Sequence, residues 1–173
     1  MKWLCCLLYL FLTVQCTKIQ TSIPAQAMEK THINPYYSRT DTAKLHVSNE
    51  EWKKILPPDL YAIAREASTE RPFTGKYNDF DVLGTYYCTV CGNHLFRSSS
   101  KFASTCGWPS FFQAEKNGVA YRRDSSHGME RVEVICKRCD SHLGHVFNDG
   151  PPPTGNRYCM NSVSLDFEAD LGD

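Results

Sequence analysis

The sequence lacks an excess of charge of either sign, a membrane-length apolar run and a glycosylation sequon. Lys plus Arg and Asp plus Glu each number 19 among 173 residues, so no net basic field exists to hold phosphate backbones, and nucleic acid is not an expected partner. The longest mostly apolar run, about a dozen residues, is shorter than the roughly 20 that span a bilayer. No Asn-x-Ser/Thr triplet occurs, and the final residues EADLGD are not a retention tetrapeptide for the endoplasmic reticulum. The composition that remains, 42% apolar and 22% charged, is typical of one globular domain.

The apolar run near the start, WLCCLLYLFLTV, is typical of a secretory signal peptide. A lysine precedes it, and cleavage is expected after Cys16 or, at the small-residue pattern AQA, after Ala27. A signal anchor or a buried core segment is the alternative, which the abrupt end of the apolar run disfavours. We therefore expect a leader over residues 1–16, or 1–27 with the later cleavage. The mature chain is expected in the secretory pathway or outside the cell, with no membrane contact once the leader is removed.

Residues 17–47 have no sustained hydrophobic period and are expected to form a flexible lead-in to a domain at 48–170. The domain opens with helix signals: Ser48 is placed as an N-cap, Glu51 follows three residues later, and Pro57 ends the segment. A second short helix is expected next, with an apolar face formed by Leu60, Ile63, Ala64 and Ala67. The expected role of both helices is to pack on the core.

Beyond residue 84, short runs of aromatic and β-branched residues are broken by Gly, Asn, Ser and Pro, which is typical of strands. The runs are TYYCTV (85–90), HLFRS (94–98), GVAYRR (118–123), RVEVIC (131–136) and SVSLDF (162–167). Alternation places Val132 and Val134 on one face of their strand. In the last run, the residues predicted to share a face are Val163, Leu165 and Phe167. No helical segment is long enough to cross over between parallel strands, so we expect a mainly β fold with antiparallel sheets.

Six of the nine cysteines lie beyond the leader: Cys88, Cys91, Cys106, Cys136, Cys139 and Cys159. An even number in a secreted chain suggests disulfides, but four of them form two C-x-x-C turns, Cys88 to Cys91 and Cys136 to Cys139. Each turn directs two thiolates at one point, and two turns complete the tetrahedral S₄ set that zinc favours. Two local disulfides and thioredoxin-like redox pairs are the alternatives; the first is strained between near neighbours, and the second needs a strand-to-helix context that is absent. We expect one structural zinc ion per chain.

The last two cysteines, Cys106 in STCGWPSFF and Cys159 in NRYCMNS, each stand alone among polar residues and glycine. A buried inert thiol and a structural disulfide between the two are the ordinary explanations. Arg157 lies two residues before Cys159, where its charge would favour the thiolate. His142 and His145 in SHLGHVF are candidates to donate a proton near neutral pH, although a single histidine is more often structural.

Several segments together resemble the B-type methionine sulfoxide reductases, which act on the R epimer at sulfur. They are TERPFTGKYN, CTVCGNHLF, CGWPSF and the run SHGMERVEVICKRCDSHLGHVFNDGPPPTGNRYCMNS. The resemblance covers residues 48 to about 167. It implies a fold of two antiparallel sheets, a β-tent, with the site on one sheet and short N-terminal helices outside. By the same resemblance, Cys159 matches the nucleophile, Cys106 matches the recycling cysteine, and the four C-x-x-C cysteines match the structural zinc ligands.

The resemblance also assigns the pocket. Trp108 matches the indole against which the substrate methyl group rests, and His145 matches the proton donor. His142 matches a second histidine of the site, and Arg157 and Asn161 match the polar frame of the pocket. The implied substrate is methionine sulfoxide in oxidised proteins, with the free amino acid as a further possibility, and the implied reductant is thioredoxin or another dithiol. Cys159 would become a sulfenic acid, which condenses with a nearby thiol, here Cys106.

Thr105 stands where the family commonly has glycine, so a stiffer loop is expected to slow the approach of Cys106 to Cys159. The main rival function is a non-enzymatic zinc-knuckle domain that binds proteins, since a fold alone does not fix a function. It gives the two lone cysteines no role. A secreted, disulfide-bonded structural domain is the second rival. The leader also conflicts with a thioredoxin cycle, because signal peptides lead to oxidising compartments.

Overall fold

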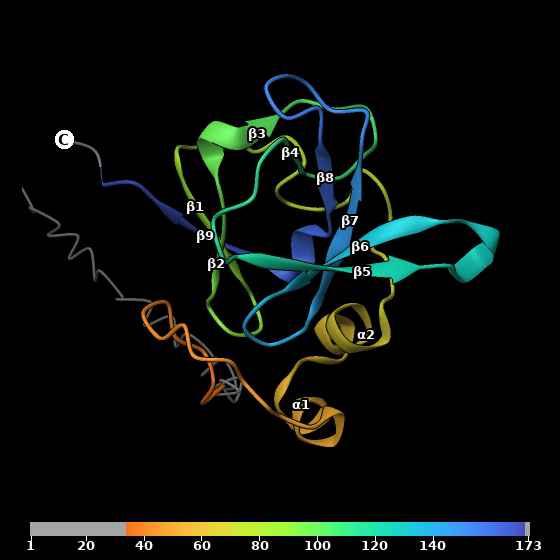
Figure 1. Cartoon of the computed structure of the whole chain (residues 1–173). Coiled ribbons are helices and arrows are strands. Elements are labelled where there is room, and N and C mark those ends of the chain that lie inside the picture. The colour runs from red at the N-terminus through yellow and green to blue at the C-terminus, as the bar shows by residue number, and fades with distance from the viewer. Residues whose placement is uncertain (1–33, 172–173) are drawn as a thin grey trace, which may run out of the picture. The chain divides into compact units, whose positions relative to one another are not determined.

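Two antiparallel sheets make up the core of residues 34–171, the part of the chain that the computed structural model describes. A three-stranded sheet has the order β2-β1-β9, and a six-stranded sheet has the order β3-β4-β8-β7-β6-β5 (Figure 1). The strands are β1 (Gly84–Cys88), β2 (His94–Arg97), β3 (Lys101–Phe102), β4 (Ser110–Phe111), β5 (Val119–Asp124), β6 (Arg131–Cys136), β7 (His142–Phe147), β8 (Arg157–Met160) and β9 (Leu165–Ala169). The predicted mainly β fold with two antiparallel sheets is confirmed. The predicted leader and residues 17–33 of the lead-in lie outside the described residues.

Two short helices precede the strands. In α1 (Asn49–Ile55), Ser48 is the N-cap, as predicted, and its Oγ accepts a hydrogen bond from the backbone N–H of Glu51 at 3.2 Å. In α2 (Pro58–Glu66), the buried residues are Leu60, Ile63 and Ala64. The prediction that Ala67 shares this face is wrong: it is the exposed C-cap, at φ 54°, because the chain leaves the helix there in the left-handed conformation. Among the described residues, neither helix has the length and apolar character needed to cross a bilayer.

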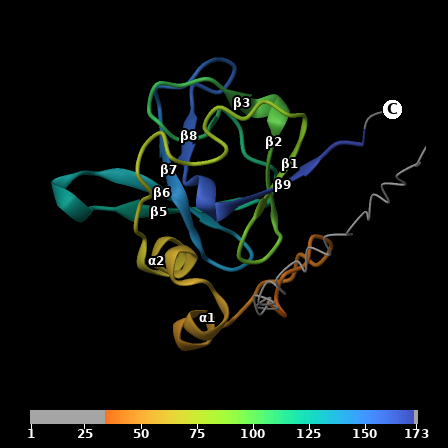
Figure 2. The same cartoon turned by 180° about the vertical axis from the view of Figure 1, so that it is seen from behind.

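One strand prediction needs correction. Val163 lies in a 3-10 turn, Ser162–Ser164, so β9 begins only at Leu165 and Val163 does not continue its face. Val132 and Val134 do share a face of β6, as predicted; Val134 is buried and Val132 is exposed. The β5–β6 hairpin extends past the other strands, so its outer half has no opposite sheet to cover it (Figures 1 and 2).

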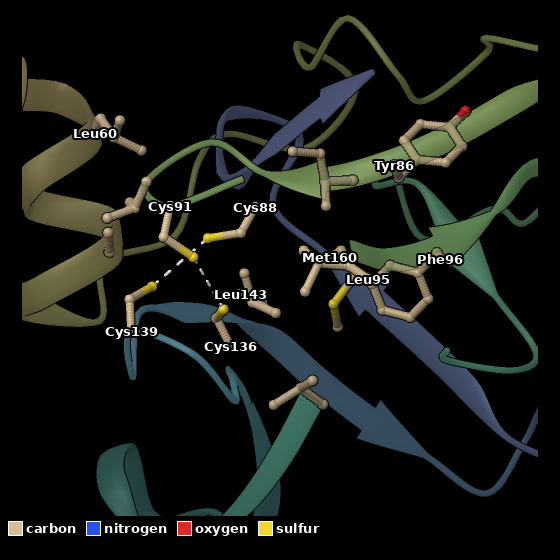
Figure 3. Packing of buried hydrophobic residues seen from close by; sticks show 14 of the residues in the cluster. Leu60, Tyr86, Cys88, Cys91, Leu95, Phe96, Cys136, Cys139, Leu143 and Met160 are labelled. Carbon is tan, nitrogen blue, oxygen red and sulfur yellow. Dashed lines mark hydrogen bonds between the residues drawn. The ribbon is translucent and has the colours of Figure 1, made fainter. Parts of the chain in front are cut away.

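The core lies between the two sheets and is rich in aromatic rings. Phe96 of β2 stacks on Phe111 of β4 with ring centroids 4.4 Å apart, and Leu143 and Met160 are fully buried beside them. Figure 3 shows that this apolar packing continues into a group of four cysteines next to Leu60 of α2. The cysteines therefore close one end of the core.

Residues 34–47 contain neither helix nor strand, but they are tied to the turn that joins Cys136 and Cys139. Arg138 in that turn is only 3% exposed. Its guanidinium donates to the carbonyl oxygens of Tyr36 at 3.0 Å and Ala43 at 3.2 Å and pairs with Asp41 at 2.8 Å. These charge-assisted bonds fix the segment against the cysteine turn.

Candidate active site

Four cysteines from two turns form one compact sulfur cluster (Figure 3). Cys88 and Cys91 come from the turn between β1 and β2, and Cys136 and Cys139 from the turn between β6 and β7. All four Sγ atoms lie within 4.8 Å of one another, with 3.8 Å between Cys88 and Cys139 and 3.6 Å between Cys91 and Cys136. A tetrahedral metal site with sulfur bonds of about 2.3 Å has sulfurs about 3.8 Å apart. The cluster fits a metal ion, and its sulfur separations are far longer than a disulfide bond of about 2.05 Å.

The ionisation of this cluster also favours a cation. Hydrogen bonds with the neighbouring cysteines and burial hold the pKa of Cys88 well above its ordinary value. Burial and Cys139 do the same to the pKa of Cys136, whereas hydrogen bonds from Cys136 and Cys88 hold the pKa of Cys139 well below its ordinary value. Without a positive ion the four buried thiols cannot all be thiolates, whereas metal binding removes their protons.

The other two cysteines face each other across 3.4 Å between their Sγ atoms. Cys159 lies in β8, and Cys106 lies in the loop between β3 and β4. Ser110 of β4 pairs directly with Cys159 in the sheet, so the short β4 strand holds the base of the loop beside the thiol of Cys159. The structure thus brings together the two cysteines that the sequence leaves unpaired, 53 residues apart.

Cys106 is the more acidic of the two thiols. Burial favours the neutral thiol of Cys106, but hydrogen bonds from the hydroxyls of Ser104 and Ser110 outweigh it and lower its pKa to about 7. Burial and the neighbouring Cys106 raise the pKa of Cys159 to about 12. A thiolate in this pair is therefore favoured on Cys106 over Cys159.

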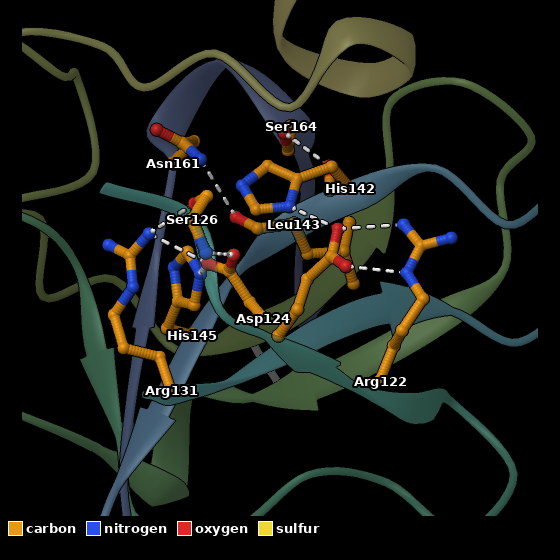
Figure 4. A network of polar contacts seen from close by, with 10 residues as sticks. Arg122, Asp124, Ser126, Arg131, His142, Leu143, His145, Asn161 and Ser164 are labelled. Carbon is orange, nitrogen blue, oxygen red and sulfur yellow. Dashed lines mark hydrogen bonds and ion pairs between the residues drawn. The ribbon is translucent and has the colours of Figure 1, made fainter. Parts of the chain in front are cut away.

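His145 is the direct cross-strand neighbour of Cys159, because β7 and β8 are paired in this register. Its Nε2 lies 2.7 Å from Oδ2 of Asp124, and the same oxygen accepts a bond of 2.7 Å from Arg131 (Figure 4). Hydrogen bonds from Ser126 and His145 hold the pKa of Asp124 well below its usual range, so it stays a carboxylate. Nε2 therefore carries a hydrogen directed at Asp124, and Nδ1 is the nitrogen left to hold or release a second proton toward a substrate.

His142 lies deeper, 2% exposed, with its ring 5.4 Å from that of His145. Its Nδ1 is 2.7 Å from Oε1 of Glu133, which also pairs with Arg122 (Figure 4). Burial lowers the pKa of His142 despite the carboxylate beside it. We infer that it is neutral at physiological pH and supports the site through Glu133.

A cavity of about 110 Å³ opens beside Cys159. Its lining residues are Thr69, Trp108, Arg131, Gly144, His145, Phe147, Cys159 and Asn161. The indole N–H of Trp108 donates to the backbone carbonyl of Glu70 at 3.2 Å, which orients one wall. Gly144 forms part of the floor, and a Cβ there would lie 2.1 Å from the carbonyl oxygen of Cys159, so only glycine permits this close approach of the strands.

Asn161 lines the cavity and Arg157 lies beside it, and the polar groups of both side chains already have protein partners. The amide of Asn161 accepts from the backbone N–H of Glu70 at 3.0 Å and donates to the carbonyl of Leu143 at 3.1 Å. The guanidinium of Arg157 binds Asp149 at 2.9 and 2.8 Å. Arg157 does lower the pKa of Cys159, in the expected direction, but burial and Cys106 outweigh it.

Several functional residues are absent from the sequence prediction. They are Thr69, Glu70, Ser104, Ser110, Asp124, Arg131, Glu133, Gly144 and Phe147. The alternation in β6 does put Arg131 and Glu133 on the face opposite Val132 and Val134. This pattern could have indicated that the two charged side chains lie on one face of the strand. Nothing in the local sequence pairs these side chains with the histidines.

Comparisons with known proteins show which family the chain is similar to. The SelR domain family matches residues 56–169. A "Peptide methionine sulfoxide reductase MsrB" of Pseudomonas putida (strain W619) is 56% identical over 126 residues, which cover 72% of this chain and 95% of that protein. The protein of the same name from Bradyrhizobium diazoefficiens is 53% identical over 132 residues, 76% of this chain and 95% of that protein. A solved structure, the Mis18 "Yippee-like" domain, aligns with a TM-score of 0.41 and 21% identity over 53% of this chain and 99% of that one.

The matched region contains both sheets, the sulfur cluster and the Cys106–Cys159 pair, so the resemblance seen in the sequence motifs is confirmed. The chain belongs to the SelR domain family and is a B-type methionine sulfoxide reductase.

Proposed function

We propose that Cys159 carries out the reduction of methionine-R-sulfoxide to methionine and that Cys106 recycles it. The activity itself is that of the family, a peptide-methionine (R)-S-oxide reductase acting with a dithiol reductant on oxidised proteins. The single observation that supports the residue roles is the distance of 3.4 Å between the two sulfurs at the edge of the cavity. A protein-binding zinc knuckle without chemistry would have no use for this pair.

In the first step Cys159 attacks the sulfoxide sulfur. Its proton passes to the Cys106 thiolate as it attacks, so the negative charge is on the nucleophile when the bond to the sulfoxide sulfur forms. His145 gives a proton to the sulfoxide oxygen from Nδ1, while Asp124 stabilises the ring charge. The S–O bond breaks with loss of hydroxide, which leaves a sulfonium joined to Cys159. Hydroxide then attacks the Cys159 sulfur, the new S–S bond breaks, methionine leaves, and Cys159 becomes a sulfenic acid.

In the second step the Cys106 thiol condenses with the sulfenic acid of Cys159, which releases water and forms a disulfide. An external dithiol then supplies two electrons and regenerates both thiols. The cavity of about 110 Å³ accommodates a small thioether side chain, and Trp108 provides an apolar wall for its methyl group. Asn161 acts by fixing Glu70, to which Trp108 is bound.

The ion of the sulfur cluster is proposed to be zinc, one per chain. Four buried thiolates in tetrahedral spacing suit zinc better than the hard cations that prefer oxygen. Cys88, Cys91, Cys136 and Cys139 would hold it, and because four protein ligands leave no open position, the ion would supply stability rather than chemistry.

The compartment is proposed to be the secretory pathway or the exterior, from the apolar leader alone. In such a compartment the reductant must be a dithiol protein that remains reduced there.

The test uses purified protein and a peptide containing methionine-R-sulfoxide. Cys159→Ser should abolish activity with either dithiothreitol or thioredoxin as reductant. Cys106→Ser should keep most of the activity with dithiothreitol, because this small thiol reduces the sulfenic acid directly, and should lose most of it with thioredoxin. Full activity of Cys159→Ser would overturn the nucleophile, and equal loss in both assays for Cys106→Ser would overturn the recycling role.

A further inference from the structure

Phe73 combines an exposed aromatic ring with an unusual backbone conformation. The residue is 67% exposed, and its φ is +64°, in the left-handed region that bulky residues rarely adopt. Such a conformation persists only where the surroundings enforce it, and it is concentrated at functional sites. An exposed large ring held in this way has no role in the core.

The contact that holds Phe73 is the loop of Cys106. The backbone N–H of Phe73 donates to the carbonyl of Gly107 at 2.7 Å. Gly107 itself has φ +91°, and a Cβ built on it would lie 2.7 Å from Cβ of Pro72 and 3.0 Å from the Phe73 ring. The ring therefore rests directly on the residue that follows the recycling cysteine.

This surface is separate from the substrate cavity. The cavity is lined by Trp108 and Cys159, whereas Phe73, Pro72 and Gly107 do not line it. A molecule that must reach the sulfur of Cys106, rather than enter the cavity, is the one that would meet Phe73. In the catalytic cycle that molecule is the reductant.

We propose that Pro72, Phe73 and Gly107 form the docking surface for the protein dithiol that reduces the Cys106–Cys159 disulfide. This inference rests on the proposed function, since it assumes that the disulfide forms during turnover. An exposed aromatic ring is the kind of anchor around which protein interfaces are centred. The partner is expected to present a small apolar surface around its reactive cysteine.

The reaction at this surface is a thiol–disulfide exchange. A thiolate of the reductant attacks the Cys106 sulfur, the Cys106–Cys159 bond breaks, and Cys159 leaves as a thiolate and takes up a proton. The second thiol of the reductant then attacks the mixed disulfide and releases Cys106, so the reductant ends as a disulfide. Two electrons pass from the reductant to the enzyme.

The test compares Phe73→Asn with Phe73→Trp in the full chain. Asparagine tolerates the left-handed region and keeps the backbone bond to Gly107, so it removes the ring without forcing the loop to move. Leu83→Asn is the matched control, because Leu83 is 68% exposed and lies away from the cysteines, just before β1. With thioredoxin as reductant, Phe73→Asn should lower kcat/KM for thioredoxin at least tenfold, Phe73→Trp should retain it, and Leu83→Asn should leave it unchanged.

With dithiothreitol, all three variants should stay within twofold of the unchanged protein. A loss with both reductants, or a higher KM for the peptide, would mean that Phe73 shapes the catalytic loop or binds substrate, and would overturn the docking role. Unchanged use of thioredoxin by Phe73→Asn would also overturn it.

A second measurement is independent of sulfoxide reduction. The disulfide is formed with diamide, and the protein is mixed with a thioredoxin whose second active-site cysteine is replaced by serine. A mixed disulfide on Cys106 should form rapidly in the unchanged protein and at least tenfold more slowly in Phe73→Asn. Equal rates in the two proteins, or a mixed disulfide on Cys159, would overturn the docking proposal even if the protein is an active reductase. Inactivity of the unchanged protein with dithiothreitol would instead count against the proposed function.

Discussion

Asp124 accepts hydrogen bonds of 2.7 Å from both His145 and Arg131 through one oxygen, Oδ2. His145 is in turn opposite Cys159 in the sheet. The chain of contacts from Arg131 through Asp124 to His145 (Figure 4) thus ends at a residue that lines the same cavity as Cys159. A carboxylate in this position fixes which ring nitrogen carries the hydrogen and stabilises the charged ring.

Asp124→Asn is expected to lower kcat by roughly tenfold to a hundredfold, because support of this kind for a histidine is typically worth that much. Steady-state kinetics with the peptide substrate would measure the loss. Asp81→Asn, which changes an exposed carboxylate, is the control and should keep its kcat. An unchanged kcat in Asp124→Asn would contradict this role.

The hydroxyl of Ser104 lies 2.9 Å from the Cys106 sulfur and helps to lower its pKa to about 7. Ser104→Ala should raise the midpoint of Cys106 alkylation by roughly one to two units, because a hydrogen bond to a charged group is worth about 1.5–3 kcal/mol and one pKa unit is about 1.4 kcal/mol. At neutral pH the variant should therefore react more slowly. Mass spectrometry of iodoacetamide labelling as a function of pH would give the midpoint.

The control for this measurement is Ser99→Ala, an exposed serine after the β2 strand. Its alkylation midpoint should equal that of the unchanged protein. An unchanged midpoint in Ser104→Ala would mean that the charge on Cys106 depends on Ser110 and Cys159 alone.

Local sequence was sufficient where neighbours in the chain make the structure. The C-x-x-C spacing fixes two sulfurs within one turn, and the Ser48 hydroxyl binds the backbone N–H of Glu51, only three residues ahead, so both features could be predicted. Ala67 and Val163 were misplaced, because a left-handed cap ends one element and Glu70 holds the 3-10 turn before the other. Neither the left-handed cap nor the contacts of Glu70 can be read from the spacing of apolar residues in the sequence.

The polar network of the site depends on strand register, which the sequence does not specify. Asp124 and His145 are 21 residues apart, and they meet because β6 lies between β5 and β7. The strand β7 itself was not predicted, since its sequence HLGHVF has a glycine and two histidines. Its extended form comes from pairing with β6 and β8.

Glu70 joins the segment before the cavity to the segment after Cys159. Its carboxylate accepts from the backbone N–H groups of Ser162 at 2.6 Å and Val163 at 3.1 Å, while its carbonyl receives the Trp108 indole. Glu70→Ala leaves two backbone donors without this acceptor, so we expect a loss of about 1–3 kcal/mol in the free energy of unfolding. The KM for the peptide should rise severalfold as Trp108 loses its fixed position.

Chemical denaturation and peptide kinetics would measure the two effects of Glu70→Ala separately. Glu66→Ala, at the exposed end of α2, should change neither. Reduced stability with an unchanged KM would limit Glu70 to a structural role and leave the orientation of Trp108 to its packing.

The sulfur cluster ties the β1–β2 turn to the β6–β7 turn, and Arg138 ties residues 36–43 to the same place. Cys136→Ser removes one of four ligands and should reduce bound zinc from about one per chain to little or none. Because metal binding is part of the folding free energy, the midpoint of thermal unfolding should fall by at least about 10 °C. Metal analysis and calorimetry would record both, and Cys106→Ser, which lacks a thiol outside the cluster, should keep its metal and its unfolding temperature.

Residues 34–47 should also become sensitive to proteases in Cys136→Ser, since Arg138 loses the rigid turn that directs it. A stable Cys136→Ser protein without metal would show that the two turns are held by the core alone.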